Sequence, residues 1–402
     1  MDGVPMKELS VSPKAAVLFK PQISKQGENL AHDEPYIIRD GSYREVVIHT
    51  AEHVHHFRPE NLGFGDYFYR GEQWRVIRSY FDPAYTHNTG LAMLPAFHKE
   101  VAKWLNTLKN DSLRAGVGRL VVHVPTSCKV LTLRVIPQSF YGEAYDDDAS
   151  LGLFLHYGIN GLLYLQAYVK LDRVSQLQAQ ALKYAKGFAI PAEHAFKGVQ
   201  PDNAMSMEQY LQTIDEMLFT NIEVTGSILT FMLTQLAKHQ DFQQRLYEEI
   251  VAQKAEEGFN VRNYVTQQTT LLHYLTLESV RLRPATWFSA PECITIDKVI
   301  GRYKLPARTP VVIDVRRLNT NALTWGPDAT EFRPERFASL SPNEYRYGYM
   351  RFGVVSGKCL GKHMADILMK VALITILEQY RIEEVEMNIG VKDGDLAFIK
   401  RK

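Results

Sequence analysis

The stretch RFGVVSGKCLGKHMAD, residues 351–366, places Cys359 between glycines and directly before a segment with helical periodicity. Apolar residues recur at spacings of three and four from Leu360 to Ile374, which predicts a helix with Cys359 in its first turn. A thiolate is stabilised at a helix N-terminus and is a strong metal ligand. The glycines give the backbone room to approach something large and flat. From these residues alone, a small buried cysteine is an equally good interpretation.

The composition argues against several classes of protein. With 402 residues, of which 46% are hydrophobic, the chain can bury a large core. No repeat or linker divides it, so we predict a single domain over residues 1–402. Lys plus Arg (46) nearly balance Asp plus Glu (45), which argues against a nucleic-acid partner. The three cysteines are far apart and odd in number, which favours thiols in a reducing compartment over a disulfide framework.

The N-terminal region shows no apolar core of signal-peptide length, so we expect no N-terminal anchor in the chain as written. No run of eighteen uncharged apolar residues occurs, and the chain is therefore not expected to span a membrane. The most apolar run, at 151–171, contains His156 and Asn160 and is interpreted as a buried helix.

Hydrophobic periodicity predicts a mainly α protein with a small β portion. YIIRDGSYREVVIHT (36–50) is typical of two strands around an Asp-Gly turn, and TPVVIDV (309–315) of a further strand. A capping box at Ser206–Gln209 begins a long helix, and a second helix is expected at 270–283, before Pro284. In EHVHHF, no further ligand accompanies His53 and His56, so a solvated helix face is expected rather than a metal site.

Three further motifs supply charged side chains. In ESVRLRP, Glu278 and Arg281 are three residues apart and can pair on one helical face. EFRPERF supplies Arg336, about twenty residues before Cys359. GEQWRVIRSYFDP places Trp74 and Arg78 four residues apart, a pair of donors suited to an anionic edge of a ligand.

Together, WRVIR, ESVR, FRPERF and FGVVSGKCLG resemble the cytochrome P450 family in type and order, from about residue 36 to the C-terminus. The resemblance implies the cytochrome P450 fold and a haem b cofactor (iron protoporphyrin IX). It implies that Cys359 is the metal ligand, whose thiolate favours O–O bond cleavage. It also implies that Glu278, Arg281 and Arg336 form a buried ionic cluster that holds the cysteine loop. Further cofactor-binding residues implied in this way are Trp74 and Arg78 at a propionate, Phe352 near the sulfur, and Gly353 and Gly361.

The sequence departs from the family pattern at several positions. In LFTNIEVTGS, Glu223 supplies the usual acid, but Val224 stands where the family has threonine and Thr225 follows it. Glu223 and Thr225 are nevertheless the candidate catalytic pair; an equally good interpretation of Thr225 is a hydroxyl bonded to a carbonyl one turn back. Glu292 stands where an arginine is common, and the segment near 57–73 is short.

The resemblance is strongest to fungal secondary-metabolism members and implies an oxidoreductase of the monooxygenase type. We expect hydroxylation or oxidative coupling of a small, largely apolar metabolite, using O2 and electrons from NADPH-cytochrome P450 reductase. A haem-thiolate isomerase or dehydratase that needs no O2, and a non-catalytic truncated relic, are the alternatives. The family resemblance suggests the surface of the endoplasmic reticulum. The chain as written suggests the cytoplasm, with membrane association only if an anchor is missing from it.

Overall fold

The computed structural model describes residues 5–11, 21–41, 43–57, 78–79, 81–111, 118–141, 207–353, 358–386 and 391–401. They belong to two compact units, the first from residues 1–75 and 273–362 and the second from 76–272 and 363–402. The single domain predicted for 1–402 stays a prediction. Trp74, the apolar run at 151–171 and residues 58–73 lie outside the described residues.

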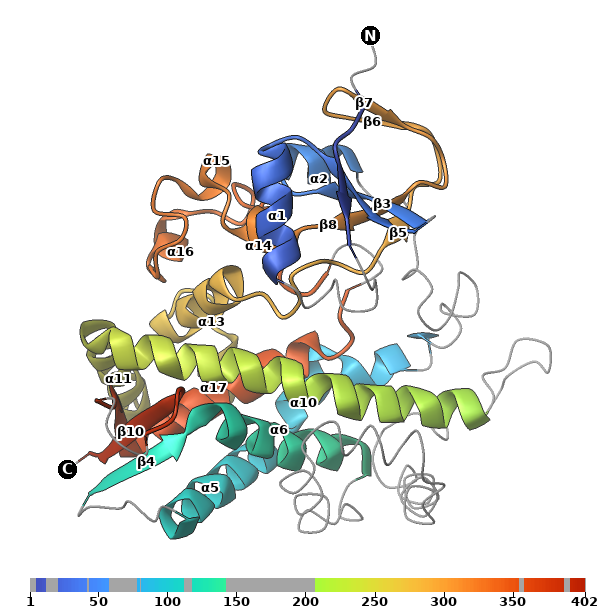
Figure 1. Cartoon of the computed structure of the whole chain (residues 1–402). Coiled ribbons are helices and arrows are strands. Elements are labelled where there is room, and N and C mark those ends of the chain that lie inside the picture. Colours follow the sequence, from blue (N-terminus) through green and yellow to red (C-terminus); the bar gives the residue numbers. More distant parts are fainter. Residues whose placement is uncertain are drawn as a thin grey trace. The chain divides into compact units, whose positions relative to one another are not determined.

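The first unit is built around a five-stranded sheet with the order β1-β2-β3-β8-β5 (Figure 1). The predicted hairpin is present, because β2 pairs antiparallel with β3 around Gly41, which has a positive φ of 60°. Its strands are β1 Glu8–Ser10, β2 Tyr36–Asp40, β3 Tyr43–Ile48, β5 Glu292–Cys293 and β8 Pro310–Ile313, with a separate pair β6 Lys298–Ile300 and β7 Tyr303–Leu305. Its helices are α1 Pro21–Ala31, α2 Ala51–Phe57, α14 Val315–Asn319, α15 Ala322–Trp325, α16 Arg336–Ser339 and most of α13 Leu271–Leu282.

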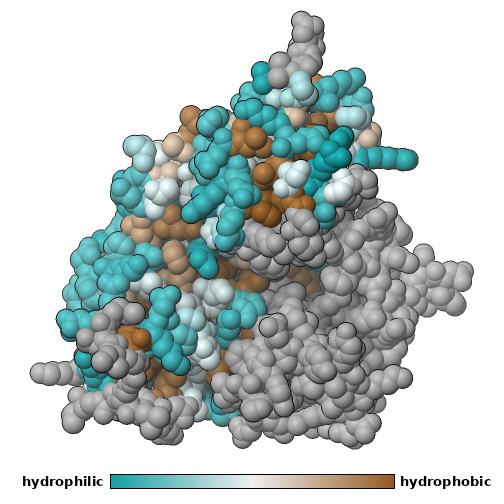
Figure 2. All heavy atoms as spheres, viewed as in Figure 1, coloured by the Kyte–Doolittle hydropathy of each residue, from teal (hydrophilic) through white to brown (hydrophobic). Residues whose placement is uncertain are grey.

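Each face of this sheet is covered by its own apolar cluster. Successive side chains of a strand point to opposite faces, so neighbouring residues enter different clusters. Val46 and Ile48 of β3 belong to one apolar cluster and Val47 to the other. Strand β8 divides in the same way, with Val312 on the face of Val47. On the molecular face shown in Figure 2, apolar side chains are interspersed among hydrophilic ones over the described surface.

The second unit is mainly helical. Its helices are η2 Asp82–Tyr85, α4 His87–Ala92, α5 Leu94–Asp111, α6 Val124–Tyr141, α10 Met207–Lys238, α11 Gln240–Ala255, α12 Val261–Thr266 and α17 Lys362–Gln379. Helix α10 starts where the capping box predicted, and it packs along α6 (Figure 1). A three-stranded sheet places β10 Asp395–Lys400 between β4 Arg119–His123 and β9 Tyr380–Glu384. The C-terminal strand is thus the centre of this sheet.

Two local expectations were wrong. Helix α17 begins at Lys362, so Cys359 precedes its first turn; the N–H of Cys359 is already bonded to the Phe352 carbonyl. His53 is buried, not solvated, because Val54 and Phe57 fix the buried face of α2 and His53 lies one turn before Phe57. His56 is exposed, as expected.

Neither a cluster of metal-ligating side chains nor a membrane-spanning helix occurs among the described residues. Within these ranges, no cluster of three or more His, Cys, Asp or Glu side chains could hold a metal ion. None of the described helices is long and apolar enough to cross a membrane.

Candidate active site

The cysteine loop, residues 351–361, carries the predicted metal ligand in the first unit. The backbone N–H of Cys359 donates to the Phe352 carbonyl over 2.7 Å, which fixes the two ends of the loop against each other. Gly353 follows with a φ of +84°, a left-handed conformation that favours glycine. The Cys359 side chain is exposed, and the Phe352 side chain is half-buried. The backbone therefore brings the cysteine and the phenylalanine of this loop together, with Cys359 exposed.

Behind this loop, Glu278, Arg281 and Arg336 meet in a buried ionic cluster. Both carboxylate oxygens of Glu278 accept from the Arg281 guanidinium, at 2.7 and 2.8 Å, in a bidentate pair. Arg336 Nε donates to Glu278 Oε1 over 3.1 Å. All three side chains are at most 1% exposed. Because the cluster is buried, removing one of these side chains would leave a buried charge without its partner, which is strongly destabilising.

Asn319 connects the ionic cluster to the start of the cysteine loop. Arg281 donates to the Asn319 carbonyl over 3.0 Å. The Asn319 side-chain amide donates to the Met350 carbonyl over 2.9 Å, and the Met350 N–H donates back to its oxygen over 2.8 Å. Met350 directly precedes the loop. Sequence reasoning missed Asn319, because no motif marks a single asparagine at the end of a short helix.

Four aromatic rings pack beside this cluster, with centroid separations of 5.4–5.9 Å: Trp325, Phe337, Tyr345 and Tyr349. The Arg281 guanidinium lies 4.9 Å from the Trp325 ring centroid. The Tyr349 hydroxyl donates to the Leu277 carbonyl over 2.7 Å, and burial raises the pKa of this hydroxyl. The rings exclude water from the ionic cluster and strengthen its electrostatic interactions.

The second unit holds Arg78, Glu223 and Thr225. Arg78 Nε lies 2.5 Å from Asp82 Oδ1, and the arginine side chain is 20% exposed. Thr225 is buried within α10 at 3% exposure. The Glu223 carboxylate lies 2.7 Å from Lys129 Nζ, which comes from α6. Sequence reasoning missed Lys129, since it lies 94 positions from its partner.

A match to a known protein family covers most of these candidate site residues. The family model described as Cytochrome P450 matches residues 190–399, which include Glu223, the ionic cluster and the cysteine loop. The chain belongs to the cytochrome P450 family. It is therefore a haem-iron oxidoreductase of the monooxygenase class.

Three fungal relatives match across most of the chain. The cytochrome P450 monooxygenase lepD of Aspergillus flavus is 37% identical, over 90% of this chain and 80% of the relative. The cytochrome P450 monooxygenase apdB of Emericella nidulans is 34% identical, over 92% of this chain and 84% of that protein. The cytochrome P450 monooxygenase opdB of Penicillium oxalicum is 32% identical, over 94% of this chain and 84% of that protein.

The residues of this P450 fit a haem. A cysteine thiolate is the ligand that holds haem iron in P450s, and Cys359 offers an exposed sulfur on a loop fixed by its own backbone. Gly353 has no side chain, and its positive φ is a conformation that favours glycine. The chemistry of the donor, an exposed cysteine, suits the cofactor.

Glu292, for which the family resemblance leads us to expect an arginine, is buried. Its carboxyl lies on β5, is 9% exposed, and has an oxygen without a hydrogen-bond partner among the described residues. Burial raises the pKa of Glu292 from 4.5 to about 7. A carboxyl cannot replace a cation at a propionate, so Glu292 does not take over the role of the arginine.

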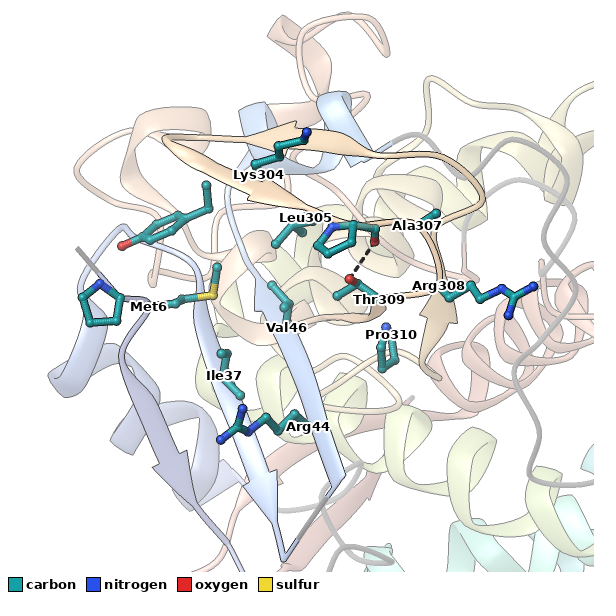
Figure 3. A pocket seen from close by; sticks show the side chains of 13 residues that line it. Met6, Ile37, Arg44, Val46, Lys304, Leu305, Ala307, Arg308, Thr309 and Pro310 are labelled. Atoms are coloured by element: carbon teal, nitrogen blue, oxygen red, sulfur yellow. Dashed lines mark hydrogen bonds between the residues drawn. The ribbon is translucent and has the colours of Figure 1, made fainter. Parts of the chain in front are cut away.

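A pocket of about 580 Å³ lies in the first unit (Figure 3). Ile37, Val46 and Leu305 are among its apolar lining residues, and Arg44 and Arg308 also line it. The Thr309 hydroxyl donates to the Pro306 carbonyl over 2.7 Å at its wall. Because none of the predicted site residues lines this pocket, it carries no part of the candidate site.

Proposed function

We propose that this P450 hydroxylates or oxidatively couples a small, largely apolar secondary metabolite, using O2 and electrons from NADPH-cytochrome P450 reductase. The observation that carries the proposal is the exposed Cys359 thiol on a loop linked to a fully buried ionic cluster through Asn319. The similarity to three fungal P450 monooxygenases supports the reaction type.

The residues of the first unit would hold haem b. Cys359 would bind the iron through its thiolate, and Phe352 would cover the cofactor beside the sulfur. Gly353 and Gly361 would leave room for the porphyrin. The bound haem supplies the activation of dioxygen. Glu278, Arg281 and Arg336 would act only by holding the loop, because their charged groups are already engaged. Both arginines pair with Glu278, and Arg336 also pairs with Asp328.

Residues of the second unit would bind a haem propionate and deliver protons. Arg78 would bind a propionate through its guanidinium, a role that the family resemblance implies for Trp74 as well. Glu223 would take protons from solvent, since its side chain is 39% exposed and a partly solvated carboxylate can exchange them. Thr225 would pass protons on through its hydroxyl, or through water, because Val224 offers none.

Val224 favours a second candidate function. Without a hydroxyl at position 224, an isomerase or dehydratase would rearrange an already oxidised substrate and need no O2. Conversion of substrate in the absence of NADPH, reductase and O2 would select this function over the monooxygenase.

The partners and location follow from the proposed reaction. A flavoprotein reductase would deliver the electrons that the proposed reaction needs. The surface of the endoplasmic reticulum is the expected location, where such reductases serve P450s.

The test is a reduced, CO-bound absorption spectrum of the purified full chain. A Soret band typical of thiolate ligation is expected for the wild type, and Cys359→Ala should abolish it. Cys293→Ala is the matched control, because Cys293 is exposed and belongs to β5. A wild type that binds no haem would support the truncated relic, and an unchanged spectrum in Cys359→Ala would refute the proposal.

A further inference from the structure

Helices α6 and α10 approach closely beside Glu223. Gly226 of α10 has no side chain, and a Cβ atom there would lie 3.1 Å from Lys129 Cγ and 3.2 Å from Lys129 Cα and N. The buried Thr132 hydroxyl of α6 lies 2.9 Å from the Lys129 carbonyl oxygen and 3.1 Å from the Ile222 carbonyl oxygen. These contacts fix the register of the two helices.

At this register, the Lys129 ammonium lies beside the Glu223 carboxylate, with Nζ and Oε1 2.7 Å apart. The two side chains are 29% and 39% exposed, so the pair is partly shielded from solvent. Among the described residues, Lys129 is the only hydrogen-bond or ion-pair partner of this carboxylate. The ammonium therefore restricts a side chain that would otherwise rotate about three bonds.

The residues that follow Glu223 on α10 show why the restriction of its carboxylate matters. Val224 has no hydroxyl, and Thr225 is two residues further on, roughly 200 degrees around the helix from Glu223. Thr225 thus lies on a different side of α10 from Glu223, and no hydrogen bond joins its hydroxyl to the carboxylate among the described residues. The Lys129 ammonium of α6 is the group that the described structure places against this carboxylate.

We propose that Lys129 is a positioning residue, whose ammonium holds the Glu223 carboxylate in the orientation that starts proton delivery. The inference rests on the proposed function, because Glu223 needs a fixed orientation only if it delivers protons. A helix-packing ion pair without this role is the competing explanation, and a charge swap separates the two.

The test uses the full-length holoenzyme with NADPH and reductase, without added substrate. Lys129→Met removes the charge and keeps the length of the side chain, whereas Lys129→Arg keeps the charge. The double variant Lys129→Glu with Glu223→Lys keeps the pair but moves the acid to α6. Lys254→Met is the matched control, because it breaks another lysine–carboxylate pair of the second unit, with Glu378.

Lys129→Met is expected to slow NADPH consumption roughly tenfold and to raise its solvent isotope effect, because a misplaced group loses much of its catalytic effect. Lys129→Arg should restore both values. The charge swap should have the same midpoint of thermal unfolding as the wild type, but its NADPH consumption should stay as slow as that of Lys129→Met. Lys254→Met should leave consumption and isotope effect unchanged.

An infrared readout checks the carboxylate independently of activity. The Glu223 carboxylate band, taken as wild type minus Glu223→Gln, should shift in Lys129→Met and return in Lys129→Arg. A band and a rate that stay unchanged in Lys129→Met would overturn the inference. So would a charge swap that restores the rate, since the pair would then only pack the helices.

The outcomes also separate this inference from the proposed function. If the haem-thiolate spectrum is intact but Glu223→Gln leaves NADPH consumption unchanged, the role of Lys129 is refuted and the monooxygenase proposal stands. If no haem is bound, the proposed function fails. The proton-delivery role then fails with it, whatever the infrared band shows.

Discussion

At residue scale, Glu292 is expected to make the stability of the protein depend on pH. Burial raises the pKa of this carboxyl from 4.5 to about 7, so the folded state holds the proton more tightly than the unfolded state. Its stabilising contribution is complete below about pH 4.5 and is lost as the pH rises through 7. The loss in free energy of unfolding is on the order of 3 kcal/mol.

Glu292→Gln removes this titration and should raise the unfolding temperature at pH 8, with no gain at pH 4. Thermal unfolding at the two pH values measures the effect. Glu386→Gln, at an exposed position, is the control and should change little at either pH. An equal gain at both pH values would mean that the introduced amide acts through packing and not through charge.

The ionic cluster gives a second prediction at residue scale. Arg336→Leu leaves the buried Glu278 with one of its two guanidinium partners, and it should lower the free energy of unfolding by roughly 3 kcal/mol. We expect this variant also to lose bound haem. The measurement is chemical denaturation combined with haem content.

Arg333→Leu is the control for Arg336→Leu. Arg333 pairs with Asp328, as Arg336 does, but its side chain is 56% exposed. Its loss should cost less than about 1 kcal/mol. An equal loss in free energy of unfolding in the two variants would show that burial does not determine how much the ionic cluster stabilises the protein.

At the scale of elements, the close approach of α6 and α10 predicts the effect of a single methyl group. Gly226→Ala would gain helix propensity, but its Cβ would press on the backbone of Lys129, which cannot move without shifting α6. We expect a net loss of about 1 kcal/mol in the free energy of unfolding. Ser227→Ala, at the next position, should be nearly neutral. A stabilised Gly226→Ala would show that the helices separate easily.

Local patterns predicted the elements better than the contacts between them. The hairpin at 36–48 and α13 follow from a turn and from helical periodicity, which are properties of neighbouring residues. The ionic cluster was implied by the family resemblance. The pair of Lys129 with Glu223 has no local signal, because it depends on how two distant helices pack.

The errors have the same origin. Apolar periodicity from Leu360 does not mark the first turn of α17, because the Cys359 N–H bonds to the Phe352 carbonyl instead of entering the helix. His53 has a polar side chain on a face that Val54 and Phe57 bury. In both cases a tertiary contact overrides the local preference.

At the scale of the whole molecule, the chain passes from the first unit to the second, back, and again to the second. A chain ending at residue 362 would retain every described element of the first unit but lose α17, β9 and β10. We expect amide hydrogen exchange to show protection of β2 and β3 in this truncation and loss of protection in α6 and α10. Protection of α10 equal to that of the full chain would contradict the prediction.

The central position of β10 has a consequence for synthesis of the protein. Strand β4 leaves the ribosome long before its partner, since His123 and Asp395, which bond across the two strands, are 272 positions apart. During that interval both edges of β4 present unsatisfied backbone groups, which are a template for pairing with other nascent chains. A chaperone that shields this segment should therefore raise the yield of the protein more than one that acts after chain release.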